Sequence, residues 1–484
     1  MGFDISRRTL LRGGIGLAAV GAVAGSTASS VADAAPEPRT DAEIYGVTTK
    51  DPLVERRADP FVTHRISGMY YFTGSVPEYD RVVVRGAPTL AGLGDAAETV
   101  VWRRPASGTM GGHIWAPELH RIDNRWYIYF AAGDSDDVFR VRMYVLESAL
   151  ADPRDASGWR LLGKIRTEWD SFSLDATTFA HRGKRYLVWA QGEPEIAVNS
   201  SLYIAEMASP WTLATKPTRI TTPTRSWEIL GYRVNEGPAV LIRNGRIFLT
   251  FSASATDSRY CMGLLTADAR ANLLDRASWV KTPDPIFVTD PRTRRYGPGH
   301  NSFTVAEDGE TDVLVYHARD YRDIAGDPLY DPNRHARVQK LYWHRDGTPL
   351  FGVPVGSGGP IVRLTPGDSP YGFVRHLDFA LRVDTDLREL ADSQYRFGPS
   401  ALGGSFETIT SVNHPDRVVC VVDGSLRLVP SSTADPGAAS FTRVPVRGGV
   451  ALRLASDAAR CVRHERGKLV IGRQSGAASV FRLS

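Results

Sequence analysis

The amino-acid sequence predicts an all-β protein in which a five-bladed β-propeller precedes a β-trefoil. Two sets of internal repeats carry this prediction: five strand units of about 60 residues before residue 355, and three of about 40 residues after residue 367. Long helical periodicity is almost absent, while aromatic and β-branched runs recur throughout the chain. Repetition at these periods, with strands and turns only, is typical of radial propellers and of trefoils.

The clearest propeller unit begins at Val234-Asn-Glu-Gly-Pro-Ala-Val240, where Glu236 precedes an apolar run. Arg243-Asn-Gly-Arg246 follows, and an Asn-Gly pair between two apolar runs predicts a two-residue hairpin turn. Ile247-Phe-Leu-Thr-Phe251 is then the returning strand. A carboxylate that begins an otherwise apolar hairpin needs a reason.

Four other segments share this order of polar residue, turn and aromatic strand, and they begin at Asp59, Glu118, Asp175 and His300. With Glu236, the five starting points are separated by 59, 57, 61 and 64 residues. Successive blades of a propeller place their innermost strands around one axis. The sequence therefore predicts that these five side chains converge at the centre of the propeller.

The first 34 residues are predicted to be an export signal. Arg7-Arg8 precedes a modest apolar run over residues 15–24, and Ala32-Asp33-Ala34 offers the small-x-small site of a signal peptidase. Twin arginines before weak hydrophobicity favour the twin-arginine pathway over an ordinary secretory signal. Because the apolar run is too short to span a membrane, we expect a secreted, soluble protein.

Charge and cysteine content exclude several classes of partner. The net charge of +4 over 484 residues is small, so neither nucleic acid nor a membrane surface is expected as a partner. A monomer is expected. The three cysteines form neither a disulfide scaffold nor a zinc motif. Cys261 is interpreted as buried filler, whereas Cys420 and Cys461 share the last domain, so their pairing stays open.

Domain boundaries follow from the repeats: residues 35–355 form the propeller, 356–367 a Gly- and Pro-rich linker, and 368–484 the trefoil. Three segments of the trefoil align at intervals of 45 and 43 residues: Gly372-Phe-Val-Arg-His376, Arg417-Val-Val-Cys-Val421 and Arg460-Cys-Val-Arg-His464. Such modules bind sugars more often than they catalyse, and this one contains no acid–base pair. Catalysis is therefore expected on the propeller axis.

Three axial carboxyl groups, those of Asp59, Asp175 and Glu236, suit the cleavage of a glycosidic bond. One carboxyl group must stay ionised to activate water, and another must stay protonated to protonate the leaving oxygen. A third carboxyl group in the same pit helps to separate the pKa values, because like charges disfavour joint ionisation.

Five motifs in order, with matched spacing, resemble the blade motifs of family 43 glycoside hydrolases: Ala58-Asp-Pro-Phe61, Trp115-Ala-Pro-Glu118, Ser173-Leu-Asp-Ala176, Asn235-Glu-Gly-Pro238 and Gly299-His-Asn-Ser302. The likeness covers residues 45–355 and is greatest to the exo-acting α-L-arabinofuranosidase branch, which Arg337-Val-Gln-Lys-Leu-Tyr-Trp343 and Asp346-Gly-Thr-Pro349 also resemble. The resemblance implies that Asp59 is the general base, Glu236 the general acid and Asp175 the pKa modulator. It also implies inversion, with carboxyl groups roughly 6.5–9.5 Å apart to admit a water.

Each remaining propeller candidate has a functional and a structural interpretation. Glu118 either contacts substrate or supports neighbouring backbone, and the supporting role is favoured. His300 is either a buried core histidine or, as the resemblance implies, a residue that approaches a central calcium ion through water; calcium is the one cofactor expected. The resemblance favours Arg337 beside the catalytic pit. Three tryptophans are either core residues or sugar-stacking residues: Trp115, Trp169 and Trp227.

The trefoil is similar to the arabinofuranose-binding modules of carbohydrate-binding family 42, in which a His and an Asp of each lobe hold the sugar. His376 and Asp392 match this pair in the first lobe. The matching positions of the second lobe are Val421 and Ala438, and the third lobe keeps His464 without an acid in Gly476-Ala-Ala-Ser479. Sugar binding is therefore expected in the first lobe.

These observations together predict a secreted inverting α-L-arabinofuranosidase that releases arabinose from the non-reducing ends of α-1,5-arabinan or arabino-oligosaccharides. Arabinoxylan side chains are a further expected substrate. A β-xylosidase or an arabinanase on the same propeller stays an alternative, as does a non-catalytic lectin. A lectin has no need to keep three axial acids, which disfavours the last alternative.

Overall fold

The structure, a computed structural model, describes residues 50–484 except residue 388, and the predicted signal segment lies outside these residues. Across the described residues, regular structure consists of β-strands and short 3-10 helices, without any α-helix. No helix within this range is long and apolar enough to cross a membrane. The all-β prediction is confirmed.

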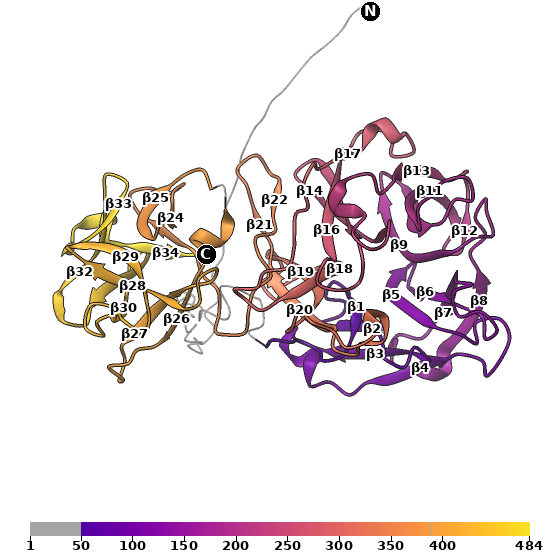
Figure 1. The fold of residues 1–484 in the computed structure, drawn as a ribbon, viewed down its shortest axis with the longest axis horizontal. Helices are drawn as coiled ribbons and strands as arrows, with labels where there is room; N and C mark the ends of the chain where they lie inside the picture. Colours follow the sequence, from indigo (N-terminus) through magenta and orange to yellow (C-terminus); the bar gives the residue numbers. More distant parts are fainter. Residues whose placement is uncertain (1–49, 388) are drawn as a thin grey trace, which may run out of the picture. The chain divides into compact units, whose positions relative to one another are not determined.

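Five antiparallel sheets follow one another along the chain and form the predicted propeller blades (Figure 1). The first blade contains β1 (Ala58–Val62), β2 (Tyr70–Ser75), β3 (Arg81–Ala87) and β4 (Thr99–Arg103). The second contains β5 (Ile114–Ile122), β6 (Arg125–Ala132), β7 (Arg142–Ser148) and β8 (Trp159–Lys164). The third contains β9 (Ser173–His181), β10 (Lys184–Gln191), β11 (Ser201–Ser209), β12 (Thr212–Leu213) and β13 (Thr218–Thr221).

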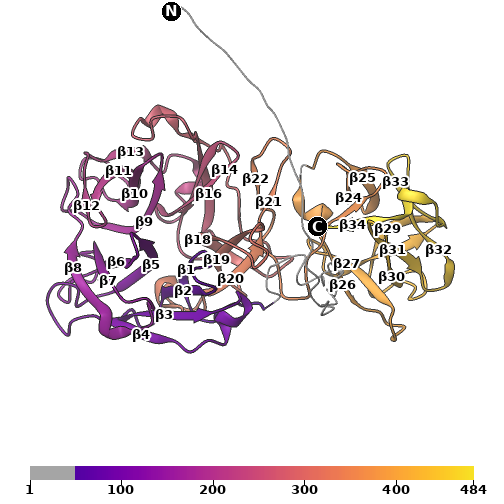
Figure 2. The same ribbon diagram turned by 180° about the vertical axis from the view of Figure 1, so that it is seen from behind.

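The last two blades complete the ring. The fourth blade contains β14 (Asn235–Arg243), β15 (Arg246–Ala253), β16 (Cys261–Asp268) and β17 (Val280–Lys281), and the fifth contains β18 (Tyr296–Val305), β19 (Asp312–Arg319) and β20 (His335–Lys340). The innermost strands β1, β5, β9, β14 and β18 contact one another in this order around the centre (Figures 1 and 2). Five 3-10 helices lie in the connections: η1 (Ala91–Gly94), η2 (Ala156–Gly158), η3 (Ser226–Glu228), η4 (Arg276–Ser278) and η5 (Pro328–Tyr330).

The innermost hairpins turn where the sequence predicts. In four blades both central turn residues have positive φ, the conformation of the primed turns that match strand twist. These pairs are Ser67-Gly68, Asp123-Asn124, Arg182-Gly183 and Asn244-Gly245. The blade repeat is thus encoded locally, by turn residues followed by strand-forming residues.

The fifth blade is completed by the segment just before β1. The backbone N–H groups of Leu53 and Val54 donate to the Ala336 carbonyl of β20 over 2.9 and 3.2 Å, and the Ala336 N–H donates back to Val54 over 2.9 Å. The guanidinium of Arg337, 1% exposed, donates to Asp51 over 2.5 Å and to Asp320 over 2.9 Å. These contacts join the start of the propeller to its last blade and close the ring.

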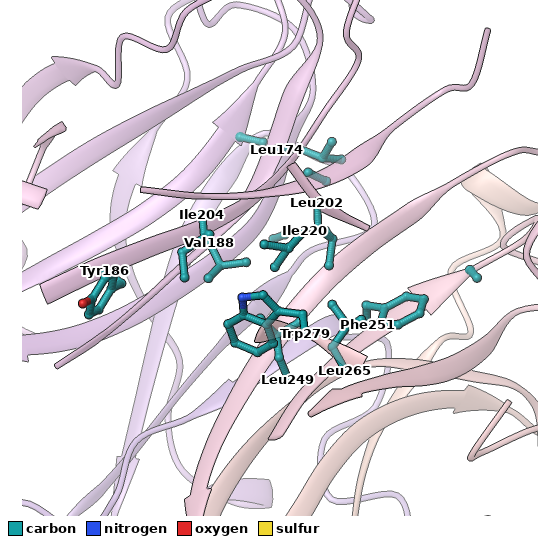
Figure 3. Close-up of a cluster of buried hydrophobic side chains, with 14 of the residues drawn as sticks. Leu174, Tyr186, Val188, Leu202, Ile204, Ile220, Leu249, Phe251, Leu265 and Trp279 are labelled. Carbon is teal, nitrogen blue, oxygen red and sulfur yellow. The ribbon is translucent and has the colours of Figure 1, made fainter. Parts of the chain in front are cut away.

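Apolar side chains fill the space between neighbouring blades. Figure 3 shows Val188 of the third blade near Leu249 and Trp279 of the fourth. Val188 and Leu249 are fully buried, and the indole of Trp279 donates to the Leu273 carbonyl over 2.9 Å. Burying a side chain of this size contributes about 1.5–3 kcal/mol, so these contacts hold the blades, and the residues they carry, in fixed positions.

The C-terminal part is a β-trefoil of three similar lobes. Three of its hairpins pair with one another through strands β25, β29 and β33: β24 (Phe373–Leu377) with β25 (Ala380–Asp384), β28 (Arg417–Val422) with β29 (Ser425–Pro430), and β32 (Asp457–Glu465) with β33 (Lys468–Arg473). Three further strand pairs alternate with these hairpins: β26 (Tyr395–Pro399) with β27 (Glu407–Ser411), β30 (Phe441–Val446) with β31 (Gly449–Leu454), and β34 (Phe481–Leu483) with β23 (Leu364–Pro366). Strand β23 therefore lies within the stretch expected as a linker. Two 3-10 helices, η6 (Leu390–Ser393) and η7 (Gly476–Ser479), precede β26 and β34, and the short hairpin of β21 (Tyr342–Trp343) and β22 (Pro349–Leu350) lies before the trefoil.

The cysteines are buried and unpaired. Cys261 lies at the start of β16, in the core between blades, as the sequence predicts. Cys420 and Cys461 lie on β28 and β32 and form no disulfide.

Candidate active site

Every innermost strand of the propeller has a residue with left-handed backbone at an irregularity of its pairing, and β18 has a second one at Gly297. These residues are Asp59 (φ 52°), Ala116 (φ 45°), Asp175 (φ 57°), Gly237 (φ 54°) and His300 (φ 41°). At each of them the pairing register with the next strand breaks, which is the pattern of a β-bulge. A bulge bends its strand and re-aims the side chains beside it, and such strained positions are concentrated at functional sites.

The bulges bring five of the predicted side chains to one cavity of about 430 Å³ at the propeller centre. Three of them are the carboxyl groups of Asp59, Asp175 and Glu236, and the others are His300 and Trp115. Asp59 and Asp175 are only 8% and 5% exposed, so their charges are largely withdrawn from water. In a low-dielectric pit their ionisation is decided by neighbouring groups.

Asp59 is surrounded by donors and cations. Ser75 donates its hydroxyl to Asp59 Oδ2 over 2.5 Å, while His300 Nδ1, His317 Nδ1 and Arg334 Nη1 lie 3.3, 3.5 and 3.6 Å from Oδ1. Burial alone would raise the pKa of Asp59, but His300 and Arg334 outweigh it and lower that pKa to about 2. Asp59 is therefore an ionised carboxylate at neutral pH.

The other two carboxyl groups are shifted in the opposite direction. Burial, reinforced by the charge of Asp175, raises the pKa of Glu236 to about 7. Burial also raises the pKa of Asp175 to about 6, against the opposing charge of His300, whose Nδ1 lies 3.8 Å away. The Gly237 N–H donates to Asp175 Oδ2 over 2.9 Å and links this carboxyl group to the bulge beside Glu236. One cavity thus holds a carboxylate and a carboxylic acid near neutral pH.

Comparison with known proteins shows that residues 49–349 match the model of Glycosyl hydrolases family 43. The chain belongs to glycosyl hydrolase family 43. A protein of Streptomyces avermitilis named extracellular exo-alpha-(1->5)-L-arabinofuranosidase is 56% identical over 350 residues, which are 72% of this chain and 73% of the relative. Alpha-L-arabinofuranosidase 43 of Humicola insolens is 52% identical over 406 residues, covering 81% and 84%.

A solved structure supports the family assignment of the propeller. The crystal structure of alpha-L-arabinofuranosidase from Lactobacillus brevis is 53% identical in sequence and superposes with a TM-score of 0.62. The match covers 64% of this chain and 98% of that one.

Several residues expected at the family 43 site lie elsewhere. Glu118 follows its bulge by two residues and lines a separate cavity of about 350 Å³ further along the inner strands, where its Oε2 is 2.7 Å from His120 Nε2. This contact is to a side chain of the same strand, so the favoured role of supporting neighbouring backbone stays a prediction. Arg337 does not reach the pit, because its guanidinium pairs with Asp51 and Asp320 at the ring closure.

Two of the three candidate tryptophans are also outside the cavity. Trp169 packs edge-on against Tyr203 in the core between the second and third blades. Trp227 stacks on Phe251, and its indole donates to the Pro283 carbonyl over 2.9 Å. Both precede an axial carboxylate in sequence, yet their loops direct the rings into packing contacts.

The cavity is also lined by residues that the sequence analysis did not single out. Arg334 replaces Arg337 as the guanidinium of the pit, is 6% exposed, and donates to the Tyr79 hydroxyl over 2.9 Å. Phe139 and Tyr232 line the cavity with exposed fractions of 52% and 59%. Because Arg334, Phe139 and Tyr232 lie in or beside loops, no strand periodicity marked them; only the sequence proximity of Tyr232 to the Asn235-Glu236 motif pointed towards it.

The side chains around His300 do not form a set of calcium ligands. Within residues 50–484, leaving out 388, no group of three or more His, Cys, Asp or Glu side chains is arranged to hold a metal. The Nδ1 atom of His300 faces the carboxylates of Asp59 and Asp175. Calcium prefers six to eight oxygen ligands, so these residues do not fit direct ligation. An approach to calcium through water stays a prediction.

The trefoil retains a polar cluster in its first lobe. His376 Nε2 lies 3.3 Å from Asp392 Oδ1, Asn413 donates to the same oxygen over 2.9 Å, and Arg375 lies 3.3 Å from Asp392 Oδ2. In the third lobe His464 Nδ1 lies 2.9 Å from Asp368 Oδ1, an acid outside the Gly476-Ala-Ala-Ser479 segment.

Proposed function

We propose that the protein is a secreted, inverting, exo-acting α-L-arabinofuranosidase that releases arabinose from α-1,5-arabinan and arabino-oligosaccharides. The observation that supports it best is that one propeller cavity holds an ionised carboxylate, Asp59, together with two carboxyl groups whose pKa values are raised, Asp175 and Glu236. Hydrolysis of a glycosidic bond needs one ionised carboxylate as base and one protonated carboxyl group as acid. The arabinan specificity is taken from the names of the relatives, and the extracellular location of two of them supports export by the predicted signal segment.

In the proposed reaction, Asp59 accepts a proton from a water molecule as the water oxygen bonds to the anomeric carbon. The bond between that carbon and the leaving oxygen breaks, and Glu236 supplies the proton that this oxygen takes up. Asp175 keeps the pKa of Glu236 high through its charge and orients the bulge through Gly237. A single displacement of this kind inverts the anomeric configuration.

The reaction is tested by incubating the protein with linear arabinan, xylan and arabinoxylan and identifying the smallest product. Arabinose as the first product from linear arabinan supports the proposal. Xylose from xylan would favour the β-xylosidase alternative, short arabino-oligosaccharides an endo-acting arabinanase, and binding without any product a lectin.

The pKa shifts predict the pH dependence of kcat/KM. Activity should fall as pH rises through about 7, because Glu236 then loses its proton, and the acidic limb should lie far lower, because Asp59 stays ionised down to about pH 2. Initial rates on arabinobiose across pH measure both limbs. The control is Glu236→Ala on an aryl arabinoside: a basic limb that persists in this variant would belong to another group.

We also propose that the trefoil is an arabinan-binding module similar to carbohydrate-binding family 42, with its site in the first lobe. Asp392→Ala is expected to abolish most binding to insoluble arabinan, because it removes the carboxylate shared by His376 and Asn413. Co-sedimentation with the polysaccharide measures this loss. Asp386→Ala, an exposed aspartate of the same module, is the control. Unchanged binding by Asp392→Ala would place the site in another lobe or on the propeller.

A further inference from the structure

We propose that Tyr260 is a positioning residue that holds Glu236 in place for proton donation and stabilises its carboxylate once the proton has left. This inference rests on the proposed function, because it assigns the acid role to Glu236. The Tyr260 hydroxyl donates to Glu236 Oε1 over 2.8 Å. In the part of the chain that the structure describes, no other group donates a hydrogen bond to this carboxyl group.

The ring of Tyr260 is held on several sides. Tyr260 directly precedes β16, is 2% exposed, and its N–H donates to the Asp257 carbonyl over 3.1 Å. The ring stacks on His317 with centroids 5.7 Å apart and planes 9° from parallel. It also lies against Gly299, where a Cβ atom would overlap the ring. Glycine before His300 therefore admits Tyr260, and the hydroxyl has little freedom to leave Glu236.

The two proposed catalytic carboxyl groups differ in the number of their donors. Asp59 accepts from the Ser75 hydroxyl and lies beside the His300 imidazole and the Arg334 guanidinium, whereas among the described residues the Tyr260 hydroxyl is the one donor to Glu236. The other ionisable groups that act on Glu236 are Asp175, Asp59 and His300, and Arg334 lies near Tyr260. One hydrogen-bond donor is too few to overcome the effect of burial, so Glu236 stays protonated near neutral pH. The same donor stabilises the negative charge that forms on Glu236 when its proton leaves during the reaction.

A hydrogen bond to the charged form of an acid lowers its pKa, and Tyr260 opposes burial at Glu236 in this way. Tyr260→Phe removes only the hydroxyl. We expect kcat on arabinobiose to fall roughly 10- to 100-fold, the loss typical of a hydrogen bond to a charged group. We also expect the basic limb of kcat/KM to move upward by about one pH unit. On 4-nitrophenyl α-L-arabinofuranoside the loss should be much smaller, because nitrophenolate departs without a proton.

Tyr127→Phe is the matched control, because the buried Tyr127 hydroxyl donates to the buried Glu147 over 3.0 Å in the second blade, away from the cavity. It should leave kcat and the pH profile unchanged, and its change in Tm measures the structural cost of losing such a bond. In a Glu236→Ala background, Tyr260→Phe should cost no further activity on the aryl substrate, since its role acts through Glu236.

Three results would overturn the inference: an unmoved basic limb, equal losses on both substrates, or failure of Tyr260→Phe to fold when Tyr127→Phe folds. Each would make the bond purely structural. If Glu236→Ala itself shows no dependence on the leaving group, the proposed function fails instead, so the two failures are distinguishable.

Discussion

Replacing Asp59 by alanine is expected to lower kcat on arabinan and on an aryl arabinoside alike, by about 10²–10⁴-fold. The variant lacks the base that accepts the proton of the attacking water, and this need is the same whatever group leaves. Because His300 and Arg334 outweigh burial and hold the Asp59 pKa at about 2, Asp59 is more fully ionised at neutral pH than Asp175 or Glu236, whose pKa values are raised. Steady-state kinetics on both substrates measures the loss.

The control for this variant is Asp268→Ala, an exposed aspartate at the end of β16, which should keep full activity. Removing Asp59 leaves His300 and Arg334 without their shared carboxylate, so the Tm of the variant is measured beside its kinetics. If Asp59→Ala recovered activity selectively on the aryl substrate, the acid and base roles would be exchanged.

The hairpins of the propeller were predictable because their information is local. A turn pair such as Asn244-Gly245 and the strands around it are specified by neighbouring residues, so the blade repeat is visible in the chain itself. The axial bulges were not predictable in the same way. One extra residue in a strand reverses the alternation of sides after it, and no residue type marks the bulge when Ala116 and Asp175 occupy equivalent positions.

This difference explains the placement of Glu118. Spacing along the sequence aligned it with Asp59 and Asp175, but the left-handed residue of its blade is Ala116, and Glu118 lies two residues beyond that bulge, where it lines a separate cavity. Glu236 is one residue before the left-handed Gly237, and still reaches the pit. The carboxyl groups are therefore placed by backbone geometry that a spacing rule only approximates.

Contacts between segments that are distant along the chain could not be predicted from the sequence either. Arg334 and Arg337 lie three residues apart, Arg334 just before β20 and Arg337 within it, where β20 pairs with residues 53–54. Arg337 meets Asp51 there, while Arg334 meets Asp59 in the pit. In the trefoil, His464 finds Asp368 across almost the full length of the module, because the three lobes close on themselves.

Replacing Glu236 by alanine is expected to lower activity on arabinan far more than activity on an aryl arabinoside. A general acid matters in proportion to how much the leaving group needs a proton, and a sugar alkoxide needs it far more than a nitrophenolate. Cleavage of arabinan should therefore be nearly abolished, while 4-nitrophenyl α-L-arabinofuranoside retains far more activity. The pH profile of kcat/KM of this variant on the aryl substrate should also lose the basic limb near pH 7, since that limb reports the proton on Glu236.

Asp175→Ala is the companion variant for this separation. It removes the charge that raises the pKa of Glu236, so we expect lower rates on both substrates and a basic limb displaced to lower pH. A Glu236→Ala protein that lost activity equally on both substrates would contradict the acid role. In that case the carboxyl group raised to a pKa of about 7 would serve binding or water activation, and the donor to the leaving oxygen would have to be sought in Asp175.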